Sequence, residues 1–267
     1  MGMEVSGKVF VVTGAGGGIG SQLVYALLAR GASVAAVDLS QKSLDGLTNE
    51  YGGKLSTHVL DITDRNAVFA LPDEVTNAHG QVDGLINCAG IIQPFVKVSE
   101  LEFDAIERVM NVNFYGTLYT TKAFLPQLLA RPEAYLVNVS SMGGFLPVPG
   151  QAVYGASKAA VKLLTEALYA ELQGTSVHVS VVFPGATATD ISKNSGVSMP
   201  GQAETAAKQS IPMLAPDKVA EIIVKGMERG KPQIFTGSDS KLMNKLYRLN
   251  PVSATRFIAR RMKSLLG

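Results

Sequence analysis

Short apolar runs alternate with amphipathic stretches along most of the chain. Runs rich in Val, Ile and Leu predict buried strands of a parallel sheet, and apolar residues spaced three and four apart predict helices. This alternation predicts a single-domain α/β fold, a Rossmann-like, doubly wound parallel sheet with helices on both faces. The expected strands are Lys8–Thr13, Ser33–Val37, Leu55–Leu60, Val82–Ile86, Tyr135–Val139, Val177–Phe183 and Gln233–Thr236. The expected helices are Ser21–Ala29, Arg65–Ala78, Leu101–Leu129, Tyr154–Leu172 and Pro216–Glu228.

A glycine-rich turn joins the first expected strand to the first expected helix. It reads GAGGGIG after Thr13, so its spacing is TGxxxGxG rather than the plain GxGxxG. Glycines let the backbone approach a phosphate closely, and the amides and dipole at a helix N-terminus favour an anion. We therefore expect a dinucleotide site contacted by Gly14, Gly18, Ile19 and Gly20.

An acidic residue, Asp38, ends the second expected strand. No Lys or Arg occurs in the glycine turn, or between Asp38 and Lys42. A carboxylate at this place can accept the ribose hydroxyls of the adenosine half and would repel a 2′-phosphate. The arrangement predicts NAD rather than NADP, and the alternative is a surface acid that only closes the strand.

A serine, a tyrosine and a lysine follow at spacings that suit hydride transfer. Tyr154 and Lys158 are four residues apart, so their side chains should leave the same face of a helix. Ser141 comes just after an apolar strand, at the sheet edge where open α/β folds bind ligands. A phenol titrates near pH 10, and an ammonium group one turn away would lower that pKa. The pattern indicates a catalytic site, although the same tyrosine–lysine spacing also occurs in ordinary amphipathic helices.

The helix that carries Tyr154 also shows an apolar pattern. We expect its formers and core face to be Ala156, Ala159, Ala160, Leu163, Leu164, Ala167 and Leu168.

These motifs resemble the classical short-chain dehydrogenase/reductase family. The likeness rests on YGASK at Tyr154–Lys158, on Ser141 thirteen residues upstream and on the TGxxxGxG turn. It runs from about residue 7 to residue 189 and more loosely to about residue 237. The resemblance implies that Asn113, within NFYG, breaks the helix geometry and holds a water for a proton relay, with Asn111 as the rival for that role.

The resemblance also implies cofactor contacts along the sheet edge. Asp61 and Ile62 would flank the adenine, and Asn87 would lie near the cofactor ribose, with Cys88 where the family usually has a second asparagine. The segment 190–212 would form a mobile lid over the substrate. The remaining implied contacts are Ala89 and Gly90 near the ribose, Tyr154 and Lys158 at the nicotinamide ribose, and Pro184, Gly185, Thr187 and Thr189 at the carboxamide.

The expected function is an NAD-dependent oxidoreductase that interconverts a secondary alcohol and a ketone. A 3-oxoacyl reductase of lipid synthesis is the nearer alternative, although such enzymes normally use NADPH. A non-catalytic nucleotide-binding or scaffold protein is the alternative from another class. The apolar residues expected around the site favour a hydrophobic small-molecule substrate, and they are Phe145, Leu146, Val148, Ile191, Val197 and Met199.

Composition and charge narrow the range of partners. The net charge is only +2, so the total suggests no nucleic-acid partner. No apolar run approaches about 18 residues and no signal-peptide pattern is present, so we expect a cytoplasmic protein. The single Cys88 allows no internal disulfide. His58, His79 and His178 share no spacing typical of ligands, so no metal site is expected.

The end of the chain differs from the rest. We expect residues 1–239 to form the Rossmann-type catalytic and dinucleotide-binding domain, and 240–267 to form a basic amphipathic extension. The extension carries seven Lys or Arg and no acid. Packing on the fold or on a neighbouring subunit, with Phe257 and Ile258 buried, is the favoured interpretation. Peripheral contact with an anionic membrane is the alternative.

The two long helices, 101–129 and 154–172, resemble those through which the family forms dimers and tetramers. We therefore expect a homodimer or a homotetramer. The apolar residues that exceed what one sheet face needs are Leu118, Phe124, Leu125, Leu163 and Leu164.

Overall fold

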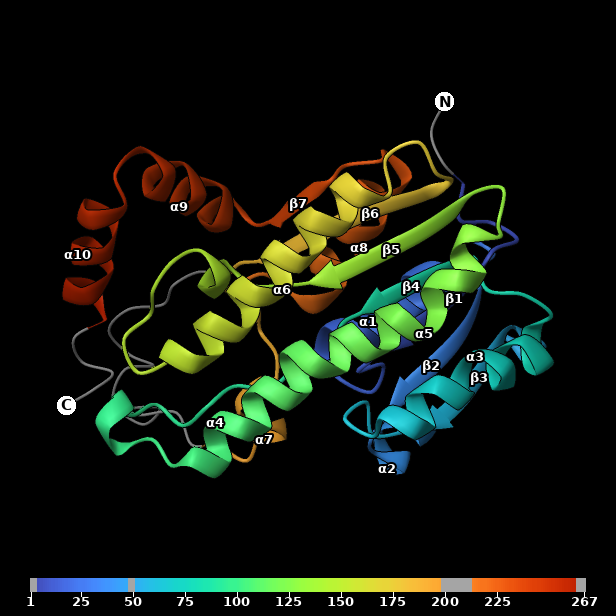
Figure 1. The fold of residues 1–267 in the computed structure, drawn as a ribbon, viewed down its shortest axis with the longest axis horizontal. Helices are drawn as coiled ribbons and strands as arrows, with labels where there is room; N and C mark the ends of the chain where they lie inside the picture. Colours follow the sequence, from blue (N-terminus) through green and yellow to red (C-terminus); the bar gives the residue numbers. More distant parts are fainter. Residues whose placement is uncertain (1–3, 48–50, 198–212, 263–267) are drawn as a thin grey trace.

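A sheet of seven parallel strands crosses the molecule, in the order β3-β2-β1-β4-β5-β6-β7 (Figure 1). The structure is a computed structural model that describes residues 4–47, 51–197 and 213–262. It confirms the fold class expected from the sequence. The strands are β1 (Val9–Thr13), β2 (Ser33–Asp38), β3 (Leu55–Val59), β4 (Gly84–Asn87), β5 (Ala134–Val139), β6 (Val177–Pro184) and β7 (Gln233–Thr236).

Helices cover both faces of the sheet (Figure 1). Those described are α1 (Gly18–Leu28), α2 (Gln41–Asp45), α3 (Arg65–His79), α4 (Phe103–Met110), α5 (Thr117–Leu129), α6 (Ala152–Glu171), α7 (Ile191–Asn194), α8 (Pro216–Glu228), α9 (Ser238–Leu249) and α10 (Pro251–Arg261). Successive side chains of a strand point to opposite faces. Accordingly Phe10 and Val12 of β1 pack with α1 and α8, whereas Val9 and Val11 pack in the core that α3, α5 and α6 cover.

The helix expected at 101–129 is interrupted. Helix α4 ends at Met110, a π-helix follows at Asn111–Gly116, and α5 continues from Thr117. The break falls on Asn113, as the family resemblance implies.

Helix α6 buries a different face from the one that its apolar pattern predicts. Leu163 is 66% exposed, and Ala156 and Ala167 are exposed as well. Polar side chains face the core of the protein instead, and they have hydrogen-bond partners there. For example, Ser157 accepts a hydrogen bond from Asn113 at 2.9 Å. The buried residues of α6 are Ser157, Lys158, Val161, Thr165 and Leu168.

The basic extension folds as α9 and α10 at one end of the sheet (Figure 1). Ala254 and Ile258 of α10 are buried in a small core with Leu146. Phe257 is 47% exposed, so it is not buried on its own fold, and its burial against a neighbouring subunit stays a prediction. Helix α9 begins at Ser238, two residues before the domain boundary proposed at 240.

Candidate active site

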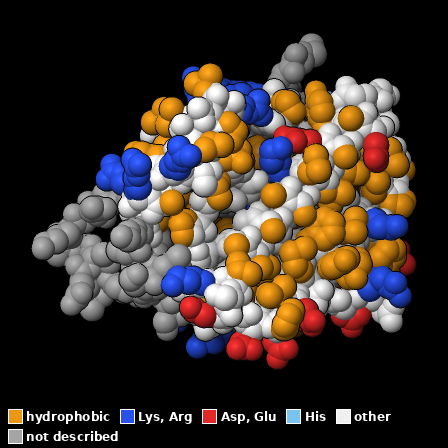
Figure 2. Space-filling view, turned by 60° about the vertical axis from the view of Figure 1, so that its left-hand side comes forward, with side chains coloured by type: hydrophobic (Ala, Val, Ile, Leu, Met, Phe, Trp, Pro, Cys, Tyr) orange, Lys and Arg blue, Asp and Glu red, His pale blue; other side chains and the backbone are white. Residues whose placement is uncertain are grey.

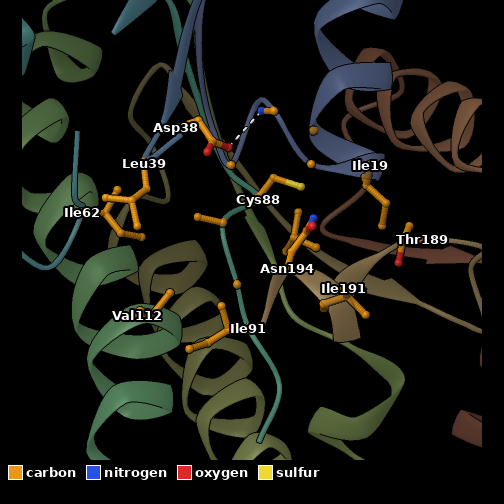
Figure 3. Close-up of a pocket in the computed structure, with 18 of the residues that line it drawn as sticks. Ile19, Asp38, Leu39, Ile62, Cys88, Ile91, Val112, Thr189, Ile191 and Asn194 are labelled. Carbon is orange, nitrogen blue, oxygen red and sulfur yellow. Dashed lines mark hydrogen bonds between the residues drawn. The ribbon is translucent and has the colours of Figure 1, made fainter. Parts of the chain in front are cut away.

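A cleft of about 960 Å³ opens at the carboxyl ends of β1 and β4 (Figure 3). These two neighbouring strands mark the point where the strand order reverses, and open α/β sheets bind ligands there. The glycine turn lies at one end of the cleft. Ser141, Tyr154 and Lys158 lie in the same cleft.

The glycine turn brings the backbone close to its surroundings. Gly14 has a φ of +67°, and a Cβ there would lie 2.7 Å from the Cα of Ala89. Helix α1 starts at Gly18 after the N-cap Gly17, and no side chain caps it. A Cβ on Gly18 would come within 2.9 Å of the Thr189 side chain. The first amides of α1 are therefore open to an anion, and the glycines leave room for its approach.

Asp38, at the end of β2, lines the cleft beside the glycine turn. Its carboxylate accepts hydrogen bonds from the backbone N–H of Gly16 and of Ser40, both at 2.9 Å; Figure 3 draws the first. The cleft residues that follow it in the chain, Leu39, Ser40 and Ser43, carry no positive charge. A carboxylate offers about four lone-pair sites, so acceptor capacity remains for hydroxyl groups.

The catalytic candidates are held by the ends of β5 and α6. Ser141 follows β5, and its Oγ accepts the backbone N–H of Gly143 at 3.0 Å. Tyr154 and Lys158 lie in the first two turns of α6. The Lys158 ammonium donates to the carbonyl of Val139 at 3.0 Å.

Burial dominates the titration of both groups on α6. Burial lowers the pKa of Lys158 to about 8. Burial also raises the pKa of Tyr154, while a hydrogen bond with Ser141 acts to lower it. The lowering by Lys158 that the sequence led us to expect does not occur in this structure, where desolvation of the phenolate raises the pKa of Tyr154 and the lysine head group donates to Val139 instead.

Asn113 lies behind the cleft rather than in its lining. It is fully buried in the π-helix, where its Oδ1 accepts the N–H of Ile91 and its Nδ2 donates to the carbonyl of Ile91, both at 2.9 Å. The same amide donates to Ser157 of α6. Asn113 thus ties the loop after β4 to α6.

Asn87 does not line the cleft either. Its amide donates to Asn138 at 2.9 Å and to Thr121 at 3.2 Å, and its carbonyl accepts from Thr120 at 2.7 Å. The side chain is therefore used inside the fold, and an approach of the backbone at Asn87 to a cofactor ribose stays a prediction.

The other expected site residues do line the cleft. Beyond Ser141, Tyr154, Lys158 and Asp38 they are Gly14, Gly18, Ile19, Gly20, Asp61, Ile62, Ala89, Gly90, Pro184, Gly185, Thr187 and Thr189.

Most of the residues expected around the substrate do not line the cleft. Ile191 lines the cleft (Figure 3), but Leu146 packs under α10 and Phe145 packs against Phe183 and Phe235. Val148 lines a separate hollow beside α6 and α9. Val197 is half-buried outside the lining of the cleft, and Met199 lies outside the described residues.

Several lining residues carried no signal that sequence reasoning used. Ile91, Val112 and Asn194 reach the cleft from three different elements (Figure 3). Arg108 of α4 also lines it.

Gln93 does not line the cleft, but it is the most consequential residue that sequence reasoning missed. It is fully buried, and its Oε1 accepts the backbone amides of Val153 and Tyr154. A lone glutamine in a loop has no pattern by which it could be found.

Metal ligation has no support in the described part of the chain, where no three His, Cys, Asp or Glu side chains could hold an ion together. His58 and His79 instead share the hydroxyl of Ser56, at 2.9 and 2.8 Å. Burial raises the pKa of Cys88, which lines the cleft, to about 12, so its thiol stays protonated at neutral pH. None of the described helices is long and apolar enough to cross a membrane.

Comparison with known proteins agrees with this geometry. SadH of Mycobacterium tuberculosis (strain ATCC 25618 / H37Rv), named as an oxidoreductase, is 35% identical over 261 residues, 95% of this chain and 94% of SadH. The 3-oxoacyl-[acyl-carrier-protein] reductase FabG of Thermotoga maritima is 34% identical over 83% of this chain and 91% of its own.

Solved structures show the same fold with either cofactor. A short chain dehydrogenase/reductase from Burkholderia phymatum in complex with NAD has a TM-score of 0.80 and 25% identity, over 92% of this chain and 96% of that one. One from Burkholderia cenocepacia in complex with NADP also has a TM-score of 0.80, with 27% identity, over 97% and 99% of the two chains. The family model for short chain dehydrogenases matches residues 8–199. The chain therefore belongs to the short-chain dehydrogenase/reductase family.

Proposed function

We propose that the protein is an NAD-dependent oxidoreductase that interconverts a secondary alcohol and a ketone. The observation that carries this proposal is that Ser141, Tyr154 and Lys158 line one cleft with the glycine turn and Asp38. A bound nicotinamide cofactor would supply hydride transfer, and the open amides of α1 together with the glycine cradle fit its pyrophosphate.

Each catalytic candidate has a role that suits its place. Tyr154 takes the alcohol proton as a general base in oxidation and returns it as an acid in reduction. Ser141 donates a hydrogen bond to the substrate oxygen and stabilises the charge that develops there. Lys158, buried one turn from Tyr154, would bind the cofactor ribose. The Asn113 amide is taken up by Ile91 and Ser157, which supports a positioning role for it beside the proton relay that the family resemblance implies.

The proposal is tested by replacing the base. Tyr154→Phe should lose nearly all turnover on a panel of alcohols and ketones and should still bind NADH. Near-normal rates in this variant would contradict the mechanism. If the unchanged protein bound NADH but turned over nothing on a broad panel, the scaffold alternative would stand.

NAD is the preferred cofactor in this proposal. A 2′-phosphate would lie against the Asp38 carboxylate, and the neighbouring cleft residues offer no cation. Repulsion between these two negative charges should weaken the binding of NADPH about a hundredfold relative to NADH. Titration with NADH and NADPH measures the difference directly, and Asp38→Ser should narrow it. Equal affinities in the unchanged protein would overturn the preference.

The substrate is proposed to be a small apolar molecule, because Ile91 and Ile191 contribute apolar surface to the cleft. Similarity to FabG supports a second candidate, reduction of a 3-oxoacyl thioester. The first candidate reaction is expected to use NAD, whereas 3-oxoacyl reductases normally use NADPH. Reduction of acyl thioesters at a higher rate with NADPH than with NADH would favour the second candidate.

A homodimer or homotetramer through α5 and α6 is the proposed assembly. Leu163 and Tyr169 of α6 and Tyr115 beside α5 are 66%, 43% and 42% exposed. The view of Figure 2 brings these helices to the right-hand part of the picture, where the surface is broadly hydrophobic. Of the leucines and phenylalanine expected there, Phe124 instead belongs to the core. Leu163→Glu should shift the sedimentation coefficient towards the monomer, whereas Phe69→Glu on α3, 49% exposed, should not.

A further inference from the structure

Helices α9 and α10 carry an unbalanced positive charge. Their basic residues are Lys241, Lys245, Arg248, Arg256, Arg260 and Arg261, all exposed. None of them forms an ion pair within the described residues. The one acid of these helices, Asp239, is occupied because it accepts the backbone N–H of Ala186 at 2.9 Å. Figure 2 shows blue side chains among orange ones at the upper left, away from most of the red ones.

The same helices expose large apolar side chains after they have packed on the fold. Their inner face, which includes Ala254 and Ile258, is covered. On α9, Leu242, Leu246 and Leu249 remain 55%, 42% and 83% exposed. These leucines are four and three residues apart and form one stripe, and the three basic residues of α9 immediately precede them along the chain. The outer face of α9 is thus an apolar stripe beside a basic stripe.

Helix α10 also exposes apolar side chains beside basic ones. Val252 is 60% and Phe257 47% exposed. The guanidinium of Arg261 lies over the Phe257 ring, 5.8 Å from its centroid. Aromatic rings and long basic side chains are typical of surfaces that lie at the boundary between headgroups and acyl chains.

We propose that the outer face of α9 and α10 is a reversible docking surface for a bilayer that contains anionic lipid. Charge complementarity selects this occupant. A second copy docked face to face would place the same uncompensated cations against one another. A nucleic acid would leave the leucine stripe without an apolar partner. Because the described helices are too short and polar to cross a membrane, the contact is interfacial.

The docking surface is attached to the rest of the molecule at the start of α9. The Ser240 hydroxyl donates to the carbonyl of Phe183 at 3.0 Å, and Asp239 holds Ala186. Ala186 lies in the segment 184–189, which lines the cleft on both sides of it. A docked molecule would therefore have a defined orientation relative to its cleft. The proposal does not depend on which reaction the cleft catalyses.

The test is co-sedimentation of the full chain with vesicles. One set contains phosphatidylcholine alone and the other contains phosphatidylcholine mixed with phosphatidylglycerol, at low and at high salt. The protein should pellet with the mixed vesicles at low salt, much less at high salt, and hardly with phosphatidylcholine alone. Each cation contributes roughly fivefold to binding at an anionic surface. The variant Lys241→Gln/Lys245→Gln/Arg248→Gln should therefore bind about a hundredfold more weakly.

A matched control removes the same charge elsewhere. Lys54→Gln/Lys97→Gln/Lys231→Gln replaces three exposed lysines that form no ion pair within the described residues, and it should bind vesicles almost unchanged. An equal loss in this control would overturn the proposal, because net charge alone would then explain the binding.

A second variant tests the apolar stripe and guards against misfolding. Leu249→Asp changes a residue that is 83% exposed, so its thermal unfolding should match that of the unchanged protein while vesicle binding falls at least tenfold. Unchanged vesicle binding by this variant would overturn the stripe's role. Absence of binding to anionic vesicles at low salt would overturn the proposal. If the protein does not bind vesicles, two further results would identify another occupant and overturn the proposal: binding of duplex DNA, or self-association that the α9 variants abolish.

Discussion

The side-chain carbonyl of Gln93 accepts the backbone N–H of Tyr154 at 3.0 Å. It also accepts the N–H of Val153 at 2.8 Å, so one buried oxygen caps the first turn of α6. The Gln93 amide donates to the carbonyl of Gly150 at 3.0 Å and thereby holds the loop before that helix. The orientation of Tyr154 therefore depends on a residue about sixty positions earlier in the chain.

Gln93→Leu should leave the amides of Val153 and Tyr154 without an acceptor. We expect a stability loss of about 1–3 kcal/mol and a fall in kcat of about tenfold or more, with little change in KM. The pH at which alcohol oxidation accelerates should also rise. A displaced Tyr154 ring would lose the hydrogen bond with Ser141 that lowers its pKa. Gln93→Glu keeps the acceptor oxygens and should restore part of kcat. A Leu variant that is less stable but has an unchanged pH profile would show that Gln93 serves stability alone.

Local pattern was enough to predict the sheet and two parts of the cleft lining, the glycine turn and Asp38. Parallel strands buried on both faces are nearly continuous apolar runs, and the glycine turn and Asp38 mark strand ends directly. Helix α6 shows where that logic fails. Its inner face carries Ser157, Lys158 and Thr165, which are tolerated because the fold pairs each of them. A hydrophobicity pattern assigns such residues to the surface, since their partners are not visible in the sequence.

The roles of buried amides depended entirely on tertiary structure. Asn87 bonds to Asn138, fifty-one residues away, and Gln93 to Tyr154, sixty-one residues away. The break in the helix at Asn113 could be anticipated only through the family resemblance. Its physical cause, the pairing of the amide with the backbone of Ile91, emerged from the structure.

Lys158 should cost the cofactor-free protein stability at neutral pH. Burial places its pKa at about 8 in the fold, against an ordinary value of 10.5, so between these values the unfolded chain binds more protons than the folded one. Stability should therefore rise with pH from about 8 to about 10.5, while the full penalty is present below pH 8. Lys158→Met should raise the free energy of unfolding by about 1–3 kcal/mol at pH 7, with the gain shrinking towards pH 10. Urea unfolding at both pH values measures this, and a gain that stayed constant with pH would argue against a depressed pKa.

The two directions of the proposed reaction should respond oppositely to pH. Burial raises the pKa of Tyr154, so the phenolate needed for alcohol oxidation should form only on the alkaline side. Oxidation should accelerate with rising pH and ketone reduction should slow. Ser141→Ala removes the hydrogen bond that lowers this pKa, so its oxidation limb should lie at still higher pH. The pH dependence of kcat/KM in the unchanged protein and in Ser141→Ala checks the sign, and a shift of the variant's oxidation profile to lower pH would contradict the assignment.

Gly14 tests whether the glycine turn binds a phosphate by close approach of the backbone. Gly14→Ala would force an L side chain into a φ of +67° and place its Cβ 2.7 Å from the Cα of Ala89. Gly174→Ala is the matched control, because its φ is +82° and no atom lies within 4 Å of the added Cβ. Both variants should lose about 1 kcal/mol of stability through backbone strain. Only Gly14→Ala must also displace the segment around Ala89, so it alone should weaken NADH binding by tenfold or more. Calorimetric titration and denaturant unfolding of the pair separate the two effects, and equal NADH affinities would show that the turn does not need this close contact.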